Sequence, residues 1–237
     1  NHLDCPEVSY VLPGDSICWE PILHSQLLTI PATDYAVIGY ALPEITQSDD
    51  WSEYDTFYIH TEKINNKHVT FLAYKHSFWG DIGGRITTCL GRLGYKNLIF
   101  VGKLGGLRST YIPNQHLATG NFSYIEGECI TWDNICNHSA DITVKKGKHI
   151  TSPSVIFEKK EWLNLVSDTF DFVDPEIGHF ARAALRNSMH FGYIHIISNS
   201  LVKNHYENLS NERLPVVLDK RRKLIAHIRR IIYRSIT

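Results

Sequence analysis

The sequence lacks the cysteine patterns of disulfide-rich and zinc-binding proteins. Its five cysteines form no CxxC pair, and their number is odd. The nearest approach to a metal-binding pattern is Cys129, Cys136 and His138, whose spacing suits zinc poorly. We therefore expect neither a metal site nor a disulfide framework, and free thiols indicate the reducing environment of the cytoplasm.

Long hydrophobic runs and an excess of one charge are also missing. No run approaches the roughly 18 apolar residues of a transmembrane helix, and no signal peptide opens the chain. The formal net charge is -1, so the chain as a whole does not attract nucleic acid or membranes. The 237 residues, 43% of them hydrophobic, can bury a sizeable core. The chain begins at Asn1, and we predict one domain over residues 1–237 that is either processed or part of a longer protein.

Strand patterns alternate with helix patterns along the chain. Short runs rich in Val, Ile, Phe and Tyr predict strands over residues 8–12, 35–42, 57–61, 69–74, 97–101, 115–119, 171–173 and 193–197. Apolar residues at helical spacing predict helices over residues 82–93, 158–166, 175–191 and 211–232. The polar stretches 46–51 and 134–148 are the best loop candidates. This alternation favours an α/β fold with a largely parallel sheet, in which ligands bind beyond the carboxyl ends of the strands.

Three polar or glycine-rich segments follow predicted strands. Gly14 and Asp15 stand in a Pro-Gly-Asp turn that can offer backbone N–H groups to an anion, or can be an ordinary turn. His76 ends a strand, where it can contact a ligand oxygen or be structural. Residues 102–106 read Gly-Lys-Leu-Gly-Gly, which predicts a turn whose backbone approaches a ligand closely. Their spacing fits neither a Walker loop nor a GxGxxG fingerprint.

A fourth pair of segments supplies a carboxylate and an amide. Glu176 and His179 are three residues apart, so a helix that starts near Pro175 places them on one face. A carboxylate there can accept two neighbouring hydroxyls. Ser198 and Asn199 close another strand, and the amide of Asn199 can both donate to and accept from a heteroaromatic base.

Together these segments resemble the nucleoside phosphorylase and nucleosidase superfamily. The turn at Asp15 resembles its N-terminal phosphate turn, and residues 101–107 are similar to its strand and Gly-Gly-Leu turn. Residues 173–179 match the place of its Met-Glu ribose motif, and the segment after His76 resembles a segment of the trimeric branch. The resemblance spans roughly residues 8 to 205. It implies a three-layer α/β/α sandwich with a central mixed, mostly parallel sheet.

Departures from the family pattern concern its phosphate site. Cys18 and Phe100 stand near the places of two arginines, and Lys103 takes the usual Ser/Thr position. A phosphorylase needs fixed cationic donors to orient phosphate. Asn199 replaces the Asp acid of many relatives, although the trimeric branch also has an Asn there. These changes favour a hydrolase, or an enzyme that acts on a phosphorylated nucleoside, over a simple phosphorylase.

The resemblance implies cleavage of the N-glycosidic bond of a nucleoside or nucleotide, with a purine base favoured. Glu176 would bind the ribose hydroxyls and Asn199 would hydrogen-bond the base as it gains charge. Phe157 would stack on the base, and His76 and Lys103 would contact the nucleophile or a substrate phosphate. Gly14, Asp15, Gly105, Gly106, His179 and Ser198 complete the expected binding site. We expect no cofactor, with phosphate the one co-substrate considered, and a homo-oligomer.

Two further hypotheses remain open from the sequence. A non-catalytic nucleotide sensor that kept the pocket would also explain the altered phosphate site. The C-terminal helix is rich in basic residues, which is typical either of a surface for RNA or acidic membranes or of the solvated face of a packed helix; we favour the packed helix.

Overall fold

The fold is built on one large mixed sheet. The computed structural model describes residues 27, 30–54, 56–75, 80–136, 143–208 and 211–237. Within them the sheet has twelve strands, joined by six parallel and five antiparallel pairings. The predicted α/β class, with helices on both sides of a mixed sheet, is confirmed.

The strands are numbered in chain order, and the helices are numbered in chain order in a separate series. The strands are β1 (Tyr35–Gly39), β2 (Ser52–Glu53), β3 (Phe57–Ile64), β4 (Lys67–Tyr74), β5 (Asn97–Gly106), β6 (Leu117–Thr119), β7 (Phe122–Ile125), β8 (Glu128–Thr131), β9 (Val144–Lys146), β10 (His149–Thr151), β11 (Phe172–Asp174) and β12 (His190–Ser200). The helices are α2 (Leu42–Thr46), α3 (Ile82–Leu93), the 3-10 turn η2 (Val155–Phe157), α4 (Lys160–Val166), α5 (Ile177–Arg186) and α6 (Pro215–Ser235). None of these helices combines the length and apolar character that crossing a bilayer requires.

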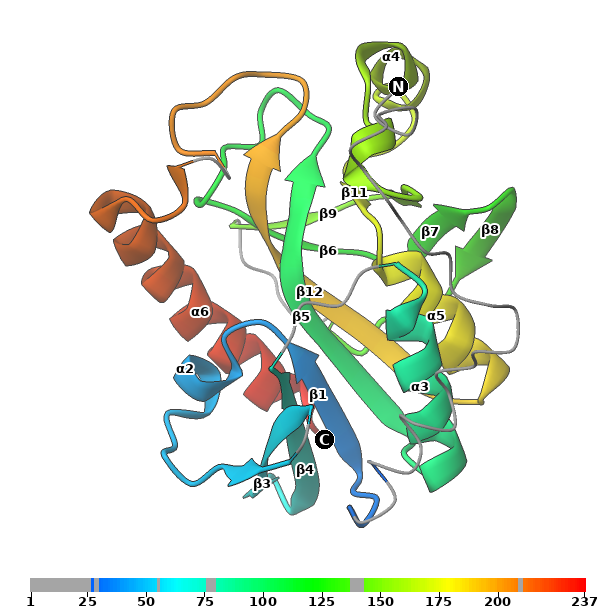
Figure 1. The fold of residues 1–237 in the computed structure, drawn as a ribbon, viewed down its shortest axis with the longest axis vertical. Coiled ribbons are helices and arrows are strands. Elements are labelled where there is room, and N and C mark those ends of the chain that lie inside the picture. The colour runs from blue at the N-terminus through cyan, green and yellow to red at the C-terminus, as the bar shows by residue number, and fades with distance from the viewer. Residues whose placement is uncertain (1–26, 28–29, 55, 76–79, 137–142, 209–210) are drawn as a thin grey trace, which may run out of the picture.

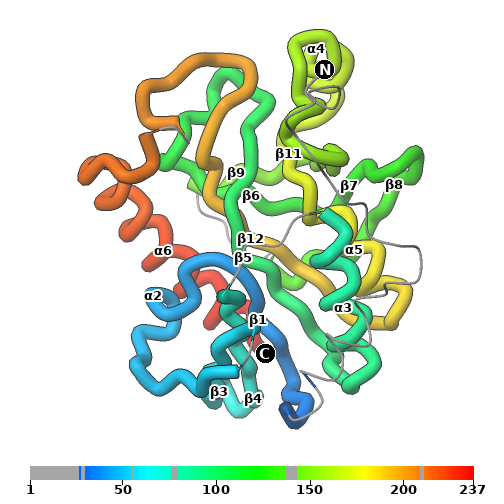
Figure 2. The backbone as a smooth tube through the Cα atoms, in the orientation of Figure 1, coloured from blue at the N-terminus to red at the C-terminus, as the bar shows by residue number. Residues whose placement is uncertain are grey.

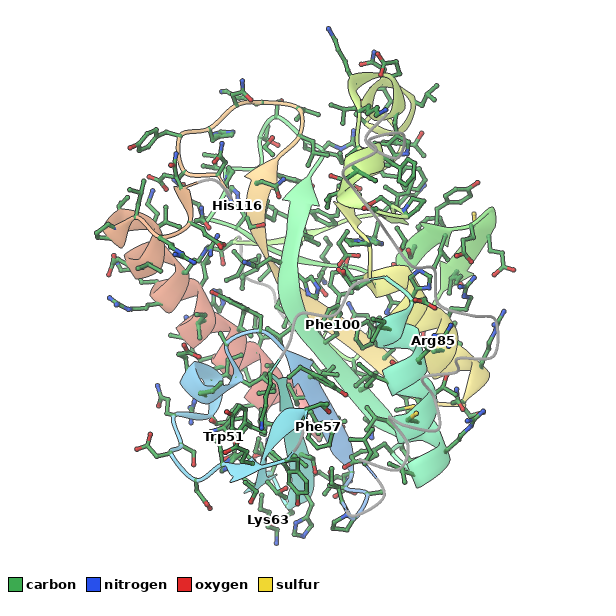
Figure 3. All side chains as sticks on the ribbon, in the orientation of Figure 1. Trp51, Phe57, Lys63, Arg85, Phe100 and His116 are labelled. Atoms are coloured by element: carbon green, nitrogen blue, oxygen red, sulfur yellow. The ribbon has the colours of Figure 1, made fainter. Side chains whose placement is uncertain are left out.

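Two helical layers cover the sheet. In Figure 1, α3 and α5 lie on one side of the central strands, and α2 and α6 lie on the other. Strand β5 serves both layers because successive side chains point to opposite faces. Leu98 and Phe100 belong to the core under α3 and α5, whereas Ile99 and Val101 belong to the core under α6. Figure 3 shows Phe100 on the side of α3 and α5.

Strands β5 and β12 form the parallel centre of the sheet (Figure 2). The prediction that residues 102–106 form a turn is wrong, because β5 continues to Gly106. The glycines serve strand packing instead. A Cβ on Gly102 would lie 2.6 Å from Nε2 of His195, and one on Gly105 would lie 2.5 Å from Cδ1 of Leu201. A side chain at Gly102 would thus require the buried ring of His195 to shift, and one at Gly105 would require the end of the Leu201 side chain to move.

Several predicted boundaries are corrected. Helix α3 matches its prediction, but α5 ends at Arg186 and the chain turns at Asn187 to enter β12 at His190, so the predicted helix over 175–191 was too long. Pro175 precedes the helix rather than lying in its first turn. The predicted loop over 134–148 contains β9, and β2, β7, β8 and β10 were not predicted. The predicted strand over 8–12 lies outside the described residues.

Helix α6 starts later than predicted and buries one of its basic residues. It begins at Pro215, which suits the first helical position because a missing N–H costs nothing there. Leu218, expected on the apolar face, is 40% exposed. Arg221 is buried instead, with Nε donating to Oδ1 of Asn114 (2.9 Å) and Nη1 donating to Oε2 of Glu212 (3.0 Å). The basic side chains of α6 are therefore not all on a solvated face.

Arg221 and Arg222 offer a matched test of this buried contact. Arg221→Ala should lower the free energy of unfolding by about 2 kcal/mol, because it removes two charge-assisted hydrogen bonds. Arg222→Ala, at an exposed position, should change it by less than about 0.5 kcal/mol. Urea denaturation of the two variants measures the difference. Equal effects would mean that the contacts of Arg221 contribute nothing.

Candidate active site

Part of the predicted site lies in segments that the structure does not describe. Gly14 and Asp15 of the N-terminal turn, Cys18 and His76 are all outside the described residues. The remaining predicted residues are placed, and they divide into a group near the start of α5 and a group on other elements.

Glu176 lies between the carboxyl end of β11 and the first turn of α5. Its side chain is buried, and its Oε1 is 3.4 Å from the backbone N of Gly80, a long hydrogen bond from the segment that precedes α3. The carboxyl group is thus held where β4 leads to α3 and β11 leads to α5. Both are carboxyl ends of strands, although β4 runs in the direction of β5 and β11 runs against it, and ligands in α/β proteins bind at such ends.

Side chains already occupy the first amides of α5. Oδ1 of Asp174 accepts hydrogen bonds from the backbone N–H of Glu176 (2.9 Å) and of Ile177 (2.8 Å). Oγ1 of Thr151 accepts from the N–H of Gly178 (2.9 Å). These bonds fix the start of the helix and so set the direction in which Glu176 leaves the backbone. They also leave these three amides unavailable to a substrate phosphate.

Asp174, two residues before Glu176, is a buried acid that lies between two buried histidines. Asp174 is 3% exposed, and His149 and His195 are fully buried. Oδ1 of Asp174 is 3.0 Å from Nε2 of His149, and Oδ2 is 3.6 Å from Nε2 of His195. Nδ1 of His149 is in turn 2.9 Å from Oγ of Ser123. We call Asp174, His149 and His195 the buried triad.

The triad stabilises the charge on its acid. Burial acts to raise the pKa of Asp174, but the two histidines, His149 foremost, and the N–H of Ile177 outweigh it, so this pKa lies below its ordinary value. Burial lowers the pKa of His195 to about 4 against the opposing attraction of Asp174, so His195 is neutral near pH 7. One negative charge is thus fixed close to the start of α5.

This environment makes Glu176 a weak acid. Burial, followed by repulsion from Asp174, raises the pKa of Glu176 to about 9. Near pH 7 its side chain is therefore a neutral carboxyl group that can both donate and accept a hydrogen bond. Such a group suits a pair of neighbouring hydroxyls, and buried carboxyl groups with shifted pKa values are typical of functional sites.

A cavity of about 380 Å³ adjoins Glu176. Pro175 and Gly80, the chain neighbour and the hydrogen-bond partner of Glu176, both contribute to its wall, as does His179. The other lining residues are Asp81, Glu126, Pro153 and Ser154. This volume lies within the range of small-molecule sites. Of the two predicted residues, His179 lines this cavity, whereas Glu176 adjoins it only through its neighbours Pro175 and Gly80, so the predicted roles of both residues stay predictions.

Ser198 and Asn199 lie near the end of β12, which extends to Ser200 and thus past the predicted end at 197. Oγ of Ser198 donates to the carbonyl of Leu104 (3.3 Å), which ties it to β5. Oδ1 of Asn199 lies close to Gly105, and Gly105 pairs with Val173 of β11. Asn199 is half-buried, and its Oδ1 accepts a long hydrogen bond from Oγ of Ser198 (3.4 Å).

Three other residues lie apart from the cavity lining. Nζ of Lys103 forms an ion pair with Glu212 (2.9 Å) on the side of α6, away from the layer that holds Glu176. Phe157 is 53% exposed in η2. Phe100, at the place of a family arginine, stacks on Phe180 in the core. Phe100 thus belongs to the core, whereas the contact of Lys103 with a nucleophile or a phosphate stays a prediction.

The triad and its hydroxyl partners were missed from the sequence. Asp174 carried a signal, since it is a carboxylate two residues before Glu176 at the end of an apolar strand. His195 carried another, because it interrupts the apolar run from Tyr193 to Ile197. His149 carried none, because β10 itself was not predicted. Among the described residues no cluster of His, Cys, Asp and Glu is arranged to hold a metal ion.

Solved structures share this fold at low sequence identity. The Plasmodium knowlesi homologue of the P. falciparum purine nucleoside phosphorylase is 13% identical, with 86% of this chain and 90% of that chain covered and a TM-score of 0.64. The Campylobacter jejuni 5'-methylthioadenosine/S-adenosylhomocysteine nucleosidase is 13% identical, with 86% and 98% covered and a TM-score of 0.65. A futalosine hydrolase mutant of Helicobacter pylori is 13% identical, with 85% and 97% covered and a TM-score of 0.62. No protein-family model matches the chain, and no curated protein matches its sequence.

Proposed function

We propose that this chain, which has the fold shared by nucleoside phosphorylases and nucleosidases, binds a nucleoside against Glu176 and cleaves its N-glycosidic bond. One observation carries the proposal: a buried carboxyl group with a pKa of about 9 stands beside a cavity at the carboxyl ends of the strands. The shared fold supports the class of reaction. The purine base, favoured from the sequence, is part of the proposal.

Charge development in the reaction gives Glu176 its role. As the glycosidic bond breaks, the sugar becomes positive and the leaving base becomes negative. In its ionised form, reached by release of the proton to solvent, Glu176 accepts hydrogen bonds from the ribose hydroxyls and places a negative charge beside the positive sugar. The attacking water supplies the oxygen that bonds to the sugar and the proton that the leaving base takes up. Asn199 hydrogen-bonds the base, and Phe157 lies on the face of the base when substrate is bound. The protein stabilises these two charges more in the transition state than in the substrate.

Hydrolysis is the proposed mode. The described residues that line the cavity include no lysine or arginine, and Lys103 is paired with Glu212. Phosphate would therefore need cationic donors from other parts of the chain. Water needs no such donors, and the carboxyl groups near the cavity can orient it.

A nucleoside panel tests both the reaction and its mode. The protein is incubated with purine and pyrimidine nucleosides, with and without phosphate, and free base is followed by chromatography. We expect release of a purine base at the same rate in both conditions. Strict dependence on phosphate would contradict hydrolysis, and absence of release from every nucleoside would contradict the enzyme proposal.

A nucleoside sensor is the second candidate. Phe100 packs in the core at a position where the family has an arginine that binds phosphate. This replacement is expected of a chain that still binds a nucleoside but no longer uses phosphate. Calorimetry distinguishes the two candidates. Saturable binding of a nucleoside without base release over hours would favour the sensor, and turnover would reject it.

A further inference from the structure

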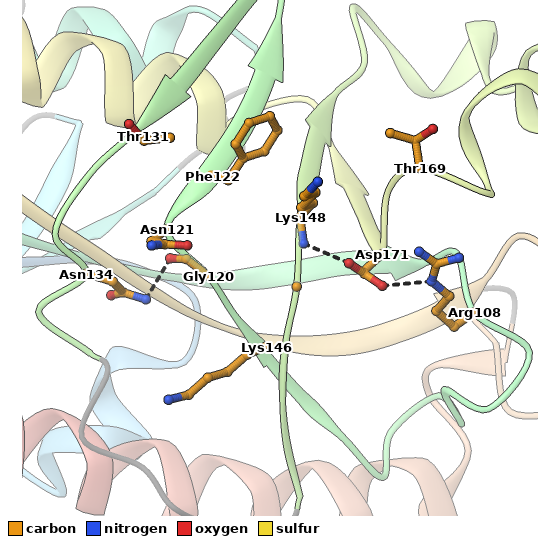
Figure 4. Close-up of a pocket in the computed structure, with 11 residues that line it drawn as sticks. Arg108, Gly120, Asn121, Phe122, Thr131, Asn134, Lys146, Lys148, Thr169 and Asp171 are labelled. Carbon is orange, nitrogen blue, oxygen red and sulfur yellow. Dashed lines mark hydrogen bonds and ion pairs between the residues drawn. The ribbon is translucent and has the colours of Figure 1, made fainter.

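A second and larger cavity lies where β7, β10 and β11 begin, next to the residues that follow the end of β5. Its volume is about 710 Å³, and Figure 4 shows its lining. It is lined by Arg108, Gly120, Asn121, Phe122, Thr131, Asn134, Lys146, Gly147, Lys148, Thr169 and Asp171. We call it the amino-edge cavity, because several of these residues immediately precede β7, β10 and β11, where these strands begin.

Strand direction separates this cavity from the candidate active site. β7, β10 and β11 are parallel, so their first residues meet at one edge and their last residues at the other. Lys148 and Asp171 precede β10 and β11, whereas Thr151 and Asp174 end these strands and hold the start of α5. A strand of three residues is about 10 Å long. The amino-edge cavity is therefore a separate site.

Charge and geometry at the amino-edge cavity suit an anion. Its lining holds three cationic side chains and one carboxylate, a formal charge of +2. The carboxylate of Asp171 is already satisfied, since it accepts from Nε of Arg108 (2.7 Å) and from the backbone N–H of Lys148 (2.8 Å). Nη1 of Arg108 donates to the carbonyl of Ser167 (2.9 Å), so the guanidinium is fixed before any ligand arrives.

Neutral groups complete a binding surface. Thr131, Thr169 and Asn121 are exposed and can donate hydrogen bonds, and Nζ of Lys148 lies 5.8 Å from the centre of the Phe122 ring. The floor is formed by backbone, because a Cβ on Gly120 would lie 2.4 Å from the carbonyl oxygen of Gly147. A ring or sugar can rest there while its anionic group meets the cations.

We propose that the amino-edge cavity binds a small molecule that carries a phosphate monoester. A phosphate monoester has a charge of about -1.5 to -2 at pH 7, which matches the formal charge of the lining better than a single carboxylate does. A preformed arginine and a lysine on a strand end are the donors that phosphate oxygens need. The volume accommodates a ligand of sugar-phosphate or nucleotide size.

Calorimetry with ribose 5-phosphate tests the proposal. The key variant is Lys148→Gln, because the side chain of Lys148 faces the ring of Phe122 and its backbone bond to Asp171 survives the change. Its matched control is Lys63→Gln, an exposed lysine on β3 at the far end of the molecule (Figure 3). We expect the wild type to bind, Lys148→Gln to bind about tenfold more weakly, and Lys63→Gln to bind as the wild type does.

Two further binding measurements distinguish this cavity from the candidate active site and phosphate recognition from sugar recognition. Glu176→Gln should bind ribose 5-phosphate at the amino-edge cavity as the wild type does, and ribose alone should not bind there. Loss of binding in Glu176→Gln but not in Lys148→Gln would place the ligand at the candidate active site and overturn the proposal. The absence of saturable binding, equal affinity in the two lysine variants, or ribose binding to Glu176→Gln as tightly as ribose 5-phosphate does would overturn it as well.

Discussion

Glu176→Gln should stop base release and at the same time make the folded protein more stable. An amide cannot lose a proton to place a negative charge beside the positive sugar, so we expect kcat/KM to fall at least about 100-fold. In the wild type the active form is the ionised carboxylate, whose pKa in the free protein is about 9. The kcat/KM of the wild type should therefore rise with pH from 7 towards 9.

The stability gain follows from the same pKa. An acid whose pKa is raised by folding holds its proton in the folded state and has lost it in the unfolded state between about pH 4.5 and pH 9. Its contribution is therefore fully present below pH 4.5 and is lost as pH rises through this window. Glutamine does not titrate, so the variant should gain about 2 kcal/mol over the wild type between pH 5 and pH 7.

Urea denaturation at several pH values and a base-release assay measure both effects. Glu44→Gln, an exposed acid in the first turn of α2, is the matched control and should alter neither property. A Glu176→Gln variant that keeps its activity would remove Glu176 from the mechanism. A stability difference that does not change with pH would mean that Glu176 is ionised in the folded protein.

Asp174→Ala should have the largest effect on stability. It removes the acceptor for the amides of Glu176 and Ile177 and leaves two buried histidines without their acid. Leaving two buried amides without an acceptor costs about 2–6 kcal/mol in total, which corresponds to a fall in Tm of about 10 °C for a chain of this size. Differential scanning calorimetry near pH 7 measures the change.

Asp174→Asn separates the two roles of this side chain. Asparagine keeps an oxygen for the helix amides but carries no negative charge, so the Tm of Asp174→Asn should lie between those of the wild type and Asp174→Ala. Asp133→Ala, an exposed position, should leave Tm within about 2 °C of the wild type. A small effect of Asp174→Ala would show that the start of α5 is held by packing alone.

Local sequence patterns predicted the long elements well. Helix α3 has a clear apolar face and a Gly94 that ends it in the left-handed conformation, so both of its ends are visible in the sequence. β3, β4 and β12 are rich in β-branched and aromatic residues. β9 and β10 are three residues long each, too short for any periodic pattern, and their formation depends on pairing with β6, β7 and β11.

The part of the candidate site that the sequence could predict depends on local spacing along the chain. Glu176 and His179 follow from helical spacing. The pKa of Glu176 does not, because it depends on burial and on Asp174, which is held by His149 from another strand. The ion pair of Lys103 was not predictable either, because its partner Glu212 lies more than 100 residues later in the chain. Long-range pairing of this kind leaves no local pattern.

Gly102 of β5 would tolerate substitution poorly in any descendant of this chain, active or not. In a saturation-mutagenesis library, variants at Gly102 should be depleted by misfolding, because a new side chain would meet the buried ring of His195, whereas the end of the Leu201 side chain can move aside for a substitution at Gly105. A lineage that abandoned catalysis would therefore keep Gly102 for generations. Glu176 lowers the stability of the folded protein, so substitutions at this position should be the first sequence changes to follow a loss of activity.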